Sequence, residues 1–214
     1  MPYFITIQYP YQYLTINLSD NQRILAEKTV TKFQAVGLLI PTIKQILQEH
    51  NLTLSDIACI GINAGPGPFN TLRSIIATAN SINFAQHTPL VACNGLDLIL
   101  EGAQQNTVAI LDAFSNDIYF AIKQSGKQGY ASIESLINDL NLLYKHETIH
   151  FIGNGALKHK DFIAEHFTGI AQFHDDMLFA SSQALIDETV RKYTTGLTTT
   201  EIFPLYFESP VVKS

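Results

Sequence analysis

Three short runs of β-branched and aromatic residues occupy the first thirty positions of the chain. They read FITIQY, YLTINL and RILAEKTV, and turn signals around Pro10 and at SDNQ separate them. Such a succession is typical of strands joined in an antiparallel meander. From about residue 32 to 50 the apolar positions recur at helical spacing, which predicts a helix. Its expected core stripe consists of Val36, Leu39, Ile40, Ile43, Ile46 and Leu47.

Buried strands and helices then alternate along the chain. After a polar break at residues 51–56, the apolar runs DIACIGINAG and PLVACN are typical of buried strands. A helical pattern follows the first run over about 69–86, and a shorter one follows the second over 96–104. The first half therefore reads β-β-β-α-β-α-β-α, which predicts a mixed sheet flanked by helices.

A second half begins near residue 106. It contains a strand pair (TVAILDAF and DIYFAIK), a helix (SIESLINDLNLLY), a strand (IHFIG), two further helices and an extended tail (TEIFPLYFESP). We predict an α/β protein with two related lobes, residues 1–104 and 105–214, of which the second is shorter.

The weak, acidic charge of the chain argues against a free-standing nucleic-acid binder. Charged residues make up 15% of the sequence and the formal net charge is −6, whereas such binders neutralise phosphates with many Lys and Arg. We therefore expect any RNA contact to come through a partner. The two cysteines, Cys59 and Cys93, stand in apolar segments and are expected to be buried and reduced.

The N-terminal residues MPYFITIQYP lack the basic and apolar regions of a signal peptide. The apolar runs of the chain are also shorter than the ~20 residues that a membrane span needs. We expect a soluble, cytoplasmic protein that makes no membrane contact.

Residues 146–150 read HETIH, which is the H-E-x-x-H pattern of zinc metallopeptidases. In those enzymes both histidines lie on one face of a helix. Here the second histidine begins IHFIG, which is typical of a strand, where residues four apart are about 13 Å from one another. Two imidazoles at that distance cannot share one zinc ion. We therefore expect a chance pattern and no peptidase site.

A turn rich in glycine and proline, Gly65-Pro66-Gly67-Pro68, links a buried strand to the helix at 69–86. Such a turn before a helix N-terminus is able to hold an anion. The residues favour instead a tight structural turn with Phe69 packed into the core, since neither a Walker lysine nor a GxGxxG pattern is present.

A strip of small residues runs beside the apolar stripe of the helix at 69–86. Small side chains let another helix approach closely, and the preceding helix also has surplus apolar width. Two interpretations stay open: a dimerisation surface, or two helices buried within their own domain. The candidate interface residues are Ala35, Leu38, Thr42, Ser74, Ala77, Thr78, Ser81 and Ala85.

The segment GPGPFNTLR resembles the GPGSFTGLR signature of the TsaB family, which serves bacterial threonylcarbamoyladenosine synthesis on tRNA. Five further segments resemble that family in the same order: LLIPTIKQIL, LSDIACIGINAGPGPF, TPLVACNGLDLI, LDAFSNDIYFA and PLYFESP. The signature turn comprises Gly65, Pro66, Gly67, Phe69, Leu72 and Arg73. Together these matches span most of the chain.

The resemblance implies two actin-like ATPase lobes of the ribonuclease H type, with mixed sheets flanked by helices and a reduced second lobe. It implies a non-catalytic subunit that pairs with TsaD through the helices at about 32–50 and 69–86, while the ATPase TsaE docks against the pair. A homodimer is expected in the absence of TsaD, and tRNA is contacted only through the complex. ATP and metal are expected on TsaD and TsaE, and no cofactor or metal on this chain.

The start of the chain fits a subunit without nucleotide chemistry. Family members usually begin ILAIDTS, whereas this chain has FITIQYP, with Gln8 where the resemblance places an Asp that orients magnesium-bound water. A neutral amide cannot do that metal work. The HxxxH pair that TsaD carries on a first-lobe helix is also absent. In the second half, Asp112 and Asp117 are expected as solvated or capping carboxylates.

The chain also departs from the family signature. Pro68, Asn70 and Thr71 replace its Ser, Thr and Gly, Ser74 and Ile75 replace the following Ile-Gly, and Ala35 stands at a family His. Since these positions lie near the expected interface, a diverged homodimeric paralogue that does not bind TsaD is a competing hypothesis. A peptidase and a stand-alone actin-like ATPase are two more hypotheses, which the residues favour less.

Overall fold

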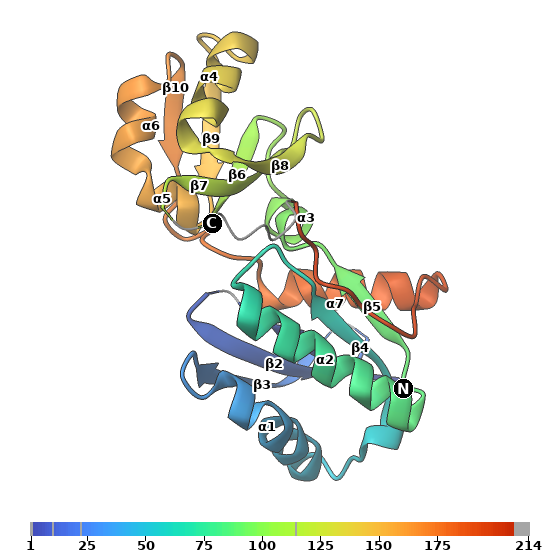
Figure 1. Cartoon of the computed structure of the whole chain (residues 1–214). Coiled ribbons are helices and arrows are strands. Elements are labelled where there is room, and N and C mark those ends of the chain that lie inside the picture. Colours follow the sequence, from blue (N-terminus) through green and yellow to red (C-terminus); the bar gives the residue numbers. More distant parts are fainter. Residues whose placement is uncertain (1, 10, 22, 114, 208–214) are drawn as a thin grey trace. The chain divides into compact units, whose positions relative to one another are not determined.

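The computed structural model describes residues 2–9, 11–21, 23–113 and 115–207. Within these ranges the chain divides into two compact units, both drawn in Figure 1. Unit 1 contains the described residues up to Leu98 and also Ser181–Leu205; unit 2 contains Ile99–Ala180 with Tyr206 and Phe207. Pro10, residue 22 of the SDNQ turn, residue 114 and residues 208–210 belong to expected turns or family-like segments and lie outside the described residues.

The sheet of unit 1 begins with the meander that the sequence predicts (Figure 1). β1, β2 and β3 are antiparallel neighbours, whereas β4 runs parallel to β1 and β5 parallel to β4. Ile7 pairs with both Ile16 and Ile62, so isoleucines of three strands share one face. The strands are β1 (Tyr3–Gln8), β2 (Tyr13–Ser19), β3 (Ile24–Thr31), β4 (Ile57–Asn63) and β5 (Leu90–Cys93), in the order β3-β2-β1-β4-β5.

Helices cover both faces of this sheet. On the isoleucine face pack α1 (Ala35–Glu49) and α2 (Phe69–Gln86), which share one hydrophobic core with the strands. On the opposite face α7 (Ser182–Thr194) contacts β1, β4 and β5. Gly61 permits this approach, because a Cβ at that position would overlap the side chain of Thr189. The short helices η1 (Leu54–Asp56) and α3 (Gly95–Leu100) precede β4 and follow β5.

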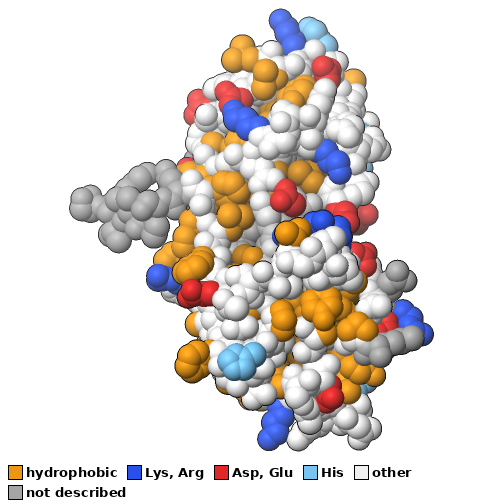
Figure 2. All heavy atoms as spheres, turned by 90° about the vertical axis from the view of Figure 1, so that its right-hand side faces the viewer, with side chains coloured by type: hydrophobic (Ala, Val, Ile, Leu, Met, Phe, Trp, Pro, Cys, Tyr) orange, Lys and Arg blue, Asp and Glu red, His pale blue; other side chains and the backbone are white. Residues whose placement is uncertain are grey.

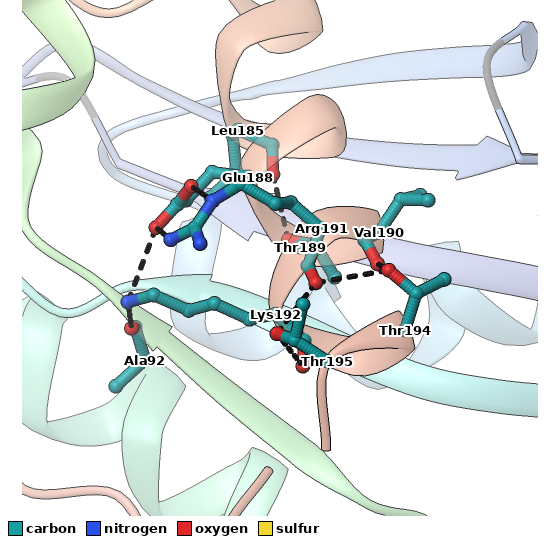
Figure 3. A network of polar contacts seen from close by, with 9 residues as sticks. All are labelled: Ala92, Leu185, Glu188, Thr189, Val190, Arg191, Lys192, Thr194 and Thr195. Carbon is teal, nitrogen blue, oxygen red and sulfur yellow. Dashed lines mark hydrogen bonds and ion pairs between the residues drawn. The ribbon is translucent and has the colours of Figure 1, made fainter. Parts of the chain in front are cut away.

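Polar contacts also hold α7 on the sheet of unit 1 (Figure 3). Lys192 Nζ donates to the backbone oxygen of Ala92 in β5 over 2.7 Å and lies 3.4 Å from the Glu188 carboxylate. Arg191 donates two hydrogen bonds of 2.7 Å to the same carboxylate. The hydrogen bonds from Arg191, together with the charges of Lys192 and Arg191, lower the pKa of Glu188 against the opposing effect of burial.

Unit 2 repeats the strand order of unit 1. β6, β7 and β8 form an antiparallel meander, and β9 and β10 extend it in parallel. α4 (Ile133–Leu143) and α6 (Lys160–His166) pack on one face around Phe151 and Phe167, and α5 (Asn154–Lys158) precedes α6. The strands are β6 (Thr107–Asp112), β7 (Asp117–Ile122), β8 (Gln128–Ser132), β9 (Thr148–Ile152) and β10 (Ile170–Phe173), in the order β10-β9-β6-β7-β8.

The predicted α/β fold with two related lobes is confirmed, as are the helices at about 32–50 and 69–86, apart from their ends. The structure divides the chain differently from the predicted boundary at 104/105, because α7 buries Leu185 and Ile186 and packs on the first sheet. Sequence reasoning missed β8 and β10, which are short and carry a weak alternating pattern. No helix among the described residues has the length and hydropathy needed to cross a membrane.

The orientation of α1 corrects its expected core stripe. Leu39 and Ile43 are buried as predicted, but Val36 and Ile40 are 56% and 62% exposed. Ala35 and Thr42 lie on the buried side instead. The helix is apolar on more than one side, so its periodicity marks several possible stripes and does not select the one that faces the sheet.

Candidate protein interface

An apolar groove with a volume of about 660 Å³ runs between α1 and α2 on unit 1. One wall comes from α1, the other from α2, and the segment ahead of β4 contributes to the lining. The lining includes Ile40, Ile43 and Leu47 of α1, Leu52 and Leu54 ahead of β4, and Ala77, Thr78, Ser81, Ile82 and Ala85 of α2. Lys44 is the one charged side chain among the described residues of this lining.

Large hydrophobic side chains extend from the groove toward solvent. Ile40 is 62% exposed, and Phe84 near the C-terminal end of α2 is 86% exposed. Val36, one helical turn before Ile40, is also exposed, whereas Leu38 is exposed on the other side of α1. Exposed apolar side chains beside an apolar groove make this face a candidate site for binding another protein. We call this groove and its exposed rim the α1–α2 surface.

The small residues of α2 present an apolar wall although several carry hydroxyl groups. Ser81 Oγ donates to the backbone oxygen of Ala77 over 2.8 Å, and Thr78 Oγ1 donates to that of Ser74 over 2.9 Å. Each hydroxyl proton is therefore used within the helix itself. The side chains of this wall are short, and they present mainly carbon atoms to a partner. Both properties suit the close packing of another helix.

The structure separates the eight candidate interface residues into three groups. Ala77, Thr78, Ser81 and Ala85 line the groove. Leu38 is exposed on α1, and Ser74 is half-buried and donates to the backbone of Asn70. Ala35 and Thr42 are 1% and 7% exposed, so a partner cannot reach them on this surface and the candidate set needs correction at both positions.

Sequence reasoning missed part of the groove for two reasons. Ile40 was expected in the core because it fits the helical stripe equally well. Leu52 and Leu54 stand inside the segment interpreted as a polar break, where two leucines among polar residues are the only signal.

Charged side chains are scattered over the face of the molecule in Figure 2. Lys and Arg alternate there with Asp and Glu, and no continuous basic stretch is visible on this face. Hydrophobic side chains are visible in both halves of the same view, and one group of them lies in the lower half, which belongs to unit 1. The described residues on this face therefore form no basic surface of the kind by which proteins bind nucleic acids on their own.

The glycine and proline turn joins the end of β4 to α2 through contacts inside unit 1. Gly65 has a φ of +113°, and a Cβ there would lie 2.9 Å from Cδ2 of Leu72, so the position requires glycine. Its N–H donates to Asn63 Oδ1 over 3.1 Å, and its carbonyl accepts from the N–H of Gly95 over 2.7 Å. The turn therefore ties the start of α2 to the start of α3.

The remaining signature residues lie along the first turns of α2. Leu72 is buried in the core, whereas Phe69 is half-buried and lies under the exposed guanidinium of Arg73, 4.4 Å from the ring centroid. Phe69 thus packs less deeply than expected. Pro68 is the residue directly before the helix, and Asn70 is exposed.

The structure places Gln8 in unit 1 and the two aspartates, Asp112 and Asp117, in unit 2. Gln8 ends β1 and is buried. In unit 2 the Asp112 carboxylate accepts from Lys158 Nζ over 2.7 Å, and Asp117 accepts from the Tyr130 hydroxyl over 2.6 Å. Among the described residues, no group of three or more His, Cys, Asp or Glu is placed to hold a metal ion.

The HETIH segment spans a loop and a strand, as the sequence predicts. His146 has a φ of +67° in the loop, and His150 lies in β9. The two histidines therefore do not share a helix face, and the metallopeptidase pattern does not correspond to the zinc-binding helix of those enzymes.

Comparison with known proteins assigns the family. Residues 34–205 match the family model described as TsaD, tRNA N6-adenosine threonylcarbamoyltransferase. The chain belongs to this family. A relative from Haemophilus influenzae, the tRNA threonylcarbamoyladenosine biosynthesis protein TsaB, is 24% identical over 87% of this chain and 83% of its own length.

Solved structures place this TsaD-family chain in the actin-like fold. YeaZ from Pseudomonas aeruginosa aligns with a TM-score of 0.74 at 17% identity and covers 95% of this chain and 100% of its own. The Lmo2764 protein of Listeria monocytogenes, described as a candidate N-acetylmannosamine kinase, aligns with a TM-score of 0.53 at 11% identity, covering 91% and 99%. At these identities the structures show the fold alone. The resemblance to TsaB and the actin-like fold class are confirmed.

Proposed function

We propose that this chain is a non-catalytic subunit in tRNA threonylcarbamoyladenosine biosynthesis that pairs with TsaD through the α1–α2 surface. The pair then offers a docking surface for TsaE, and two copies of the chain use the same surface when TsaD is absent. Membership of the TsaD family and similarity to a protein named TsaB support the pathway. The apolar groove between α1 and α2 is the observation that carries the pairing.

The groove supplies both parts of a helix-packing interface. Ala77 and Ser81 keep the α2 wall low, so that a partner helix can approach to about 8–10 Å between axes. Ile40 and Phe84 stand above that wall as large exposed anchors. Burying these side chains contributes about 25 cal/mol of binding free energy for each Å² of apolar surface removed from water. A stable interface buries roughly 1,000 Å² or more of surface in total.

In the proposed complex the chemistry takes place on the other subunits. TsaD and TsaE hold ATP and the metal, and this chain holds neither for the reaction. The buried neutral amide of Gln8 supports this part, because it stands where the resemblance places a metal-orienting Asp. The net charge of −6, together with the scattered charges on the one face that Figure 2 shows, supports contact with tRNA only through the complex.

Co-expression with TsaD from the same organism tests the pairing. The purified mixture is separated by size-exclusion chromatography with light scattering, and a one-to-one complex is expected. Ser81→Arg places a long charged side chain in the groove and is expected to abolish the complex. Ala164→Arg changes an exposed alanine on α6 in unit 2 and serves as the matched control, for which we expect an unchanged complex.

Different outcomes would favour the competing hypotheses. A stable homodimer that ignores TsaD identifies a diverged paralogue, and Pro68, Asn70 and Thr71 are then the positions to revert to the family signature. A rise in unfolding temperature with ATP and magnesium but without TsaD contradicts the absence of a nucleotide site. Peptide cleavage that chelators stop contradicts the non-catalytic assignment.

A further inference from the structure

Two histidines of unit 2 meet although 24 residues separate them in the sequence. Nδ1 of His150 lies 2.8 Å from Nε2 of His174, and the ring centroids are 5.1 Å apart. His150 belongs to β9, and His174 directly follows β10. Because β10 pairs in parallel with β9, the two histidines come close together. The N–H of His174 also donates to the backbone oxygen of Phe151 over 3.1 Å, which fixes the local register.

Both imidazoles open into a cavity of about 170 Å³ that lies wholly within unit 2. Its described lining contains no Asp, Glu, Lys or Arg, so no charge from such side chains faces the two imidazoles. Met177 lines the same cavity, together with Gln104 and Thr107. Two histidines and a methionine therefore line the same cavity.

We propose that His150 and His174, with Met177 as third ligand, bind a soft transition-metal cation, and that Cu(I) is the preferred ion. A contact of 2.8 Å between two ring nitrogens requires one shared proton, and a metal ion takes the place of that proton. Bonds of about 2.0–2.1 Å at a tetrahedral angle put two imidazole nitrogens about 3.3 Å apart. The rings therefore need to separate by only about half an ångström.

The donor set decides which ion fits. Thioether is a soft ligand that selects Cu(I), and imidazole also suits copper. The described lining of the cavity has no carboxylate that would offset the charge of a bound ion. Cu(I) brings one positive charge into the cavity and Zn(II) brings two, so Zn(II) has the larger desolvation cost. The bound ion links β9 to the segment after β10, so it stabilises unit 2 and has no part in the proposed pairing with TsaD.

Competition for Cu(I) tests the site in the full chain. Under anaerobic conditions the protein is titrated with Cu(I) in the presence of the chromophoric chelator bicinchoninate, and retention of one Cu(I) per chain is expected. His174→Gln is expected to weaken binding at least tenfold, and Met177→Leu, which keeps side-chain size, about threefold or more. His87→Asn removes an exposed histidine of unit 1 at a left-handed residue that Asn tolerates, and it should bind as the parent does.

Circular dichroism of each variant confirms that loss of binding is not loss of folding. The proposal is overturned if the parent protein retains no Cu(I) against the competitor, or if His174→Gln and Met177→Leu both bind like the parent. Equal loss in His87→Asn would show chelation by surface histidines and also overturns it. Tighter retention of Zn(II) than of Cu(I), each measured against a chelator of known affinity, overturns the choice of ion.

Discussion

The sheets of units 1 and 2 have five strands in the same order, with the same pattern of antiparallel and parallel neighbours. The helices on the two sheets differ in the surface that they expose to solvent. In unit 1, α1 and α2 have 15 and 18 residues and enclose an apolar groove. In unit 2, α4 and α6 have 11 and 7 residues, and Asn141 of α4 connects to the end of α6 through hydrogen bonds of 2.8 Å to the backbone of His166 and Thr168.

One topology thus carries two different helix pairs. The polar link in unit 2 pairs its donors and acceptors without a partner, although α4 also exposes Leu142 and Leu143 beside it. The groove of unit 1 exposes hydrocarbon that gains free energy only when another surface covers it. The last helix sharpens the contrast, since α7 follows the second sheet in sequence but packs on the first.

The two cysteines allow the units to be followed separately. Cys59 and Cys93 both lie in unit 1 and are buried, and burial raises their pKa values to about 12 and about 11. Because the thiolate is the reactive form, neither thiol is expected to react with a disulfide reagent at neutral pH while unit 1 is folded. The rate of thiol labelling therefore reports the opening of unit 1 alone.

The largest effect is expected from Phe151→Ala in the core of unit 2. Phe151 is buried and packs against the rings of Phe167 and Phe173, each 5.6 Å away between centroids. Truncation to Ala is expected to cost about 3–5 kcal/mol of unfolding free energy. Urea unfolding followed by circular dichroism measures the loss, while thiol labelling in unit 1 should keep its rate. A matching acceleration of labelling would show that the units open together.

The reverse experiment, Gly61→Ala, acts on unit 1 through α7. The new Cβ overlaps the side chain of Thr189, and overpacking of this kind is expected to cost about 1–3 kcal/mol. Thiol labelling should then accelerate, and Thr189→Ala in the same chain should restore part of the stability. Gly37→Ala is the control, because no atom lies within 4 Å of its Cβ position and Ala favours the helix by up to about 1 kcal/mol. Unchanged labelling in Gly61→Ala would contradict the tight packing of α7.

A smaller effect is expected from Glu188→Gln in the network of Figure 3. Removing the charge weakens the contacts to Arg191 and Lys192, and the partly exposed site limits the loss to about 0.5–1 kcal/mol at pH 7.

The pH dependence gives a second test of the same network. Because the pKa of Glu188 in the folded chain lies below its ordinary value of 4.5, its contribution is present above that pH and is lost as the pH falls through the lowered pKa. The stability difference between parent and Glu188→Gln should therefore shrink under acid. A difference that stays constant from pH 7 down to pH 3 would exclude this origin.

The smallest effect on stability is expected from Ile40→Ser on the rim of the groove. Since Ile40 is 62% exposed, the unfolding free energy should change by less than about 0.5 kcal/mol. Ile43→Ser, one helical turn further and buried, should cost several kcal/mol by comparison. Thermal unfolding of the two variants separates surface from core, and a large loss in Ile40→Ser would show that the rim belongs to the fold.

Local patterns were sufficient to predict much of this molecule. The meander, the buried strand before Gly65 and the helix at 69–86 follow from periodicity and turn chemistry, which depend on residues close in the chain. The residues of α2 that line the groove were partly predicted for the same reason, since small residues at helical spacing are visible in the sequence. On α1 the prediction failed at Ala35 and Thr42, because a helix with apolar residues on several sides has no unique buried stripe.

The sequence by itself determined the α/β class, the order of most elements and the family signature at the turn, because each of these features depends on residues that are close together in the chain. Only the tertiary structure decided that α7 packs on the first sheet, that Ile40 faces solvent and that His150 meets His174. These outcomes depend on strand register and on which surfaces compete for burial. Both are settled by contacts between residues far apart in the chain, and no local pattern encodes them.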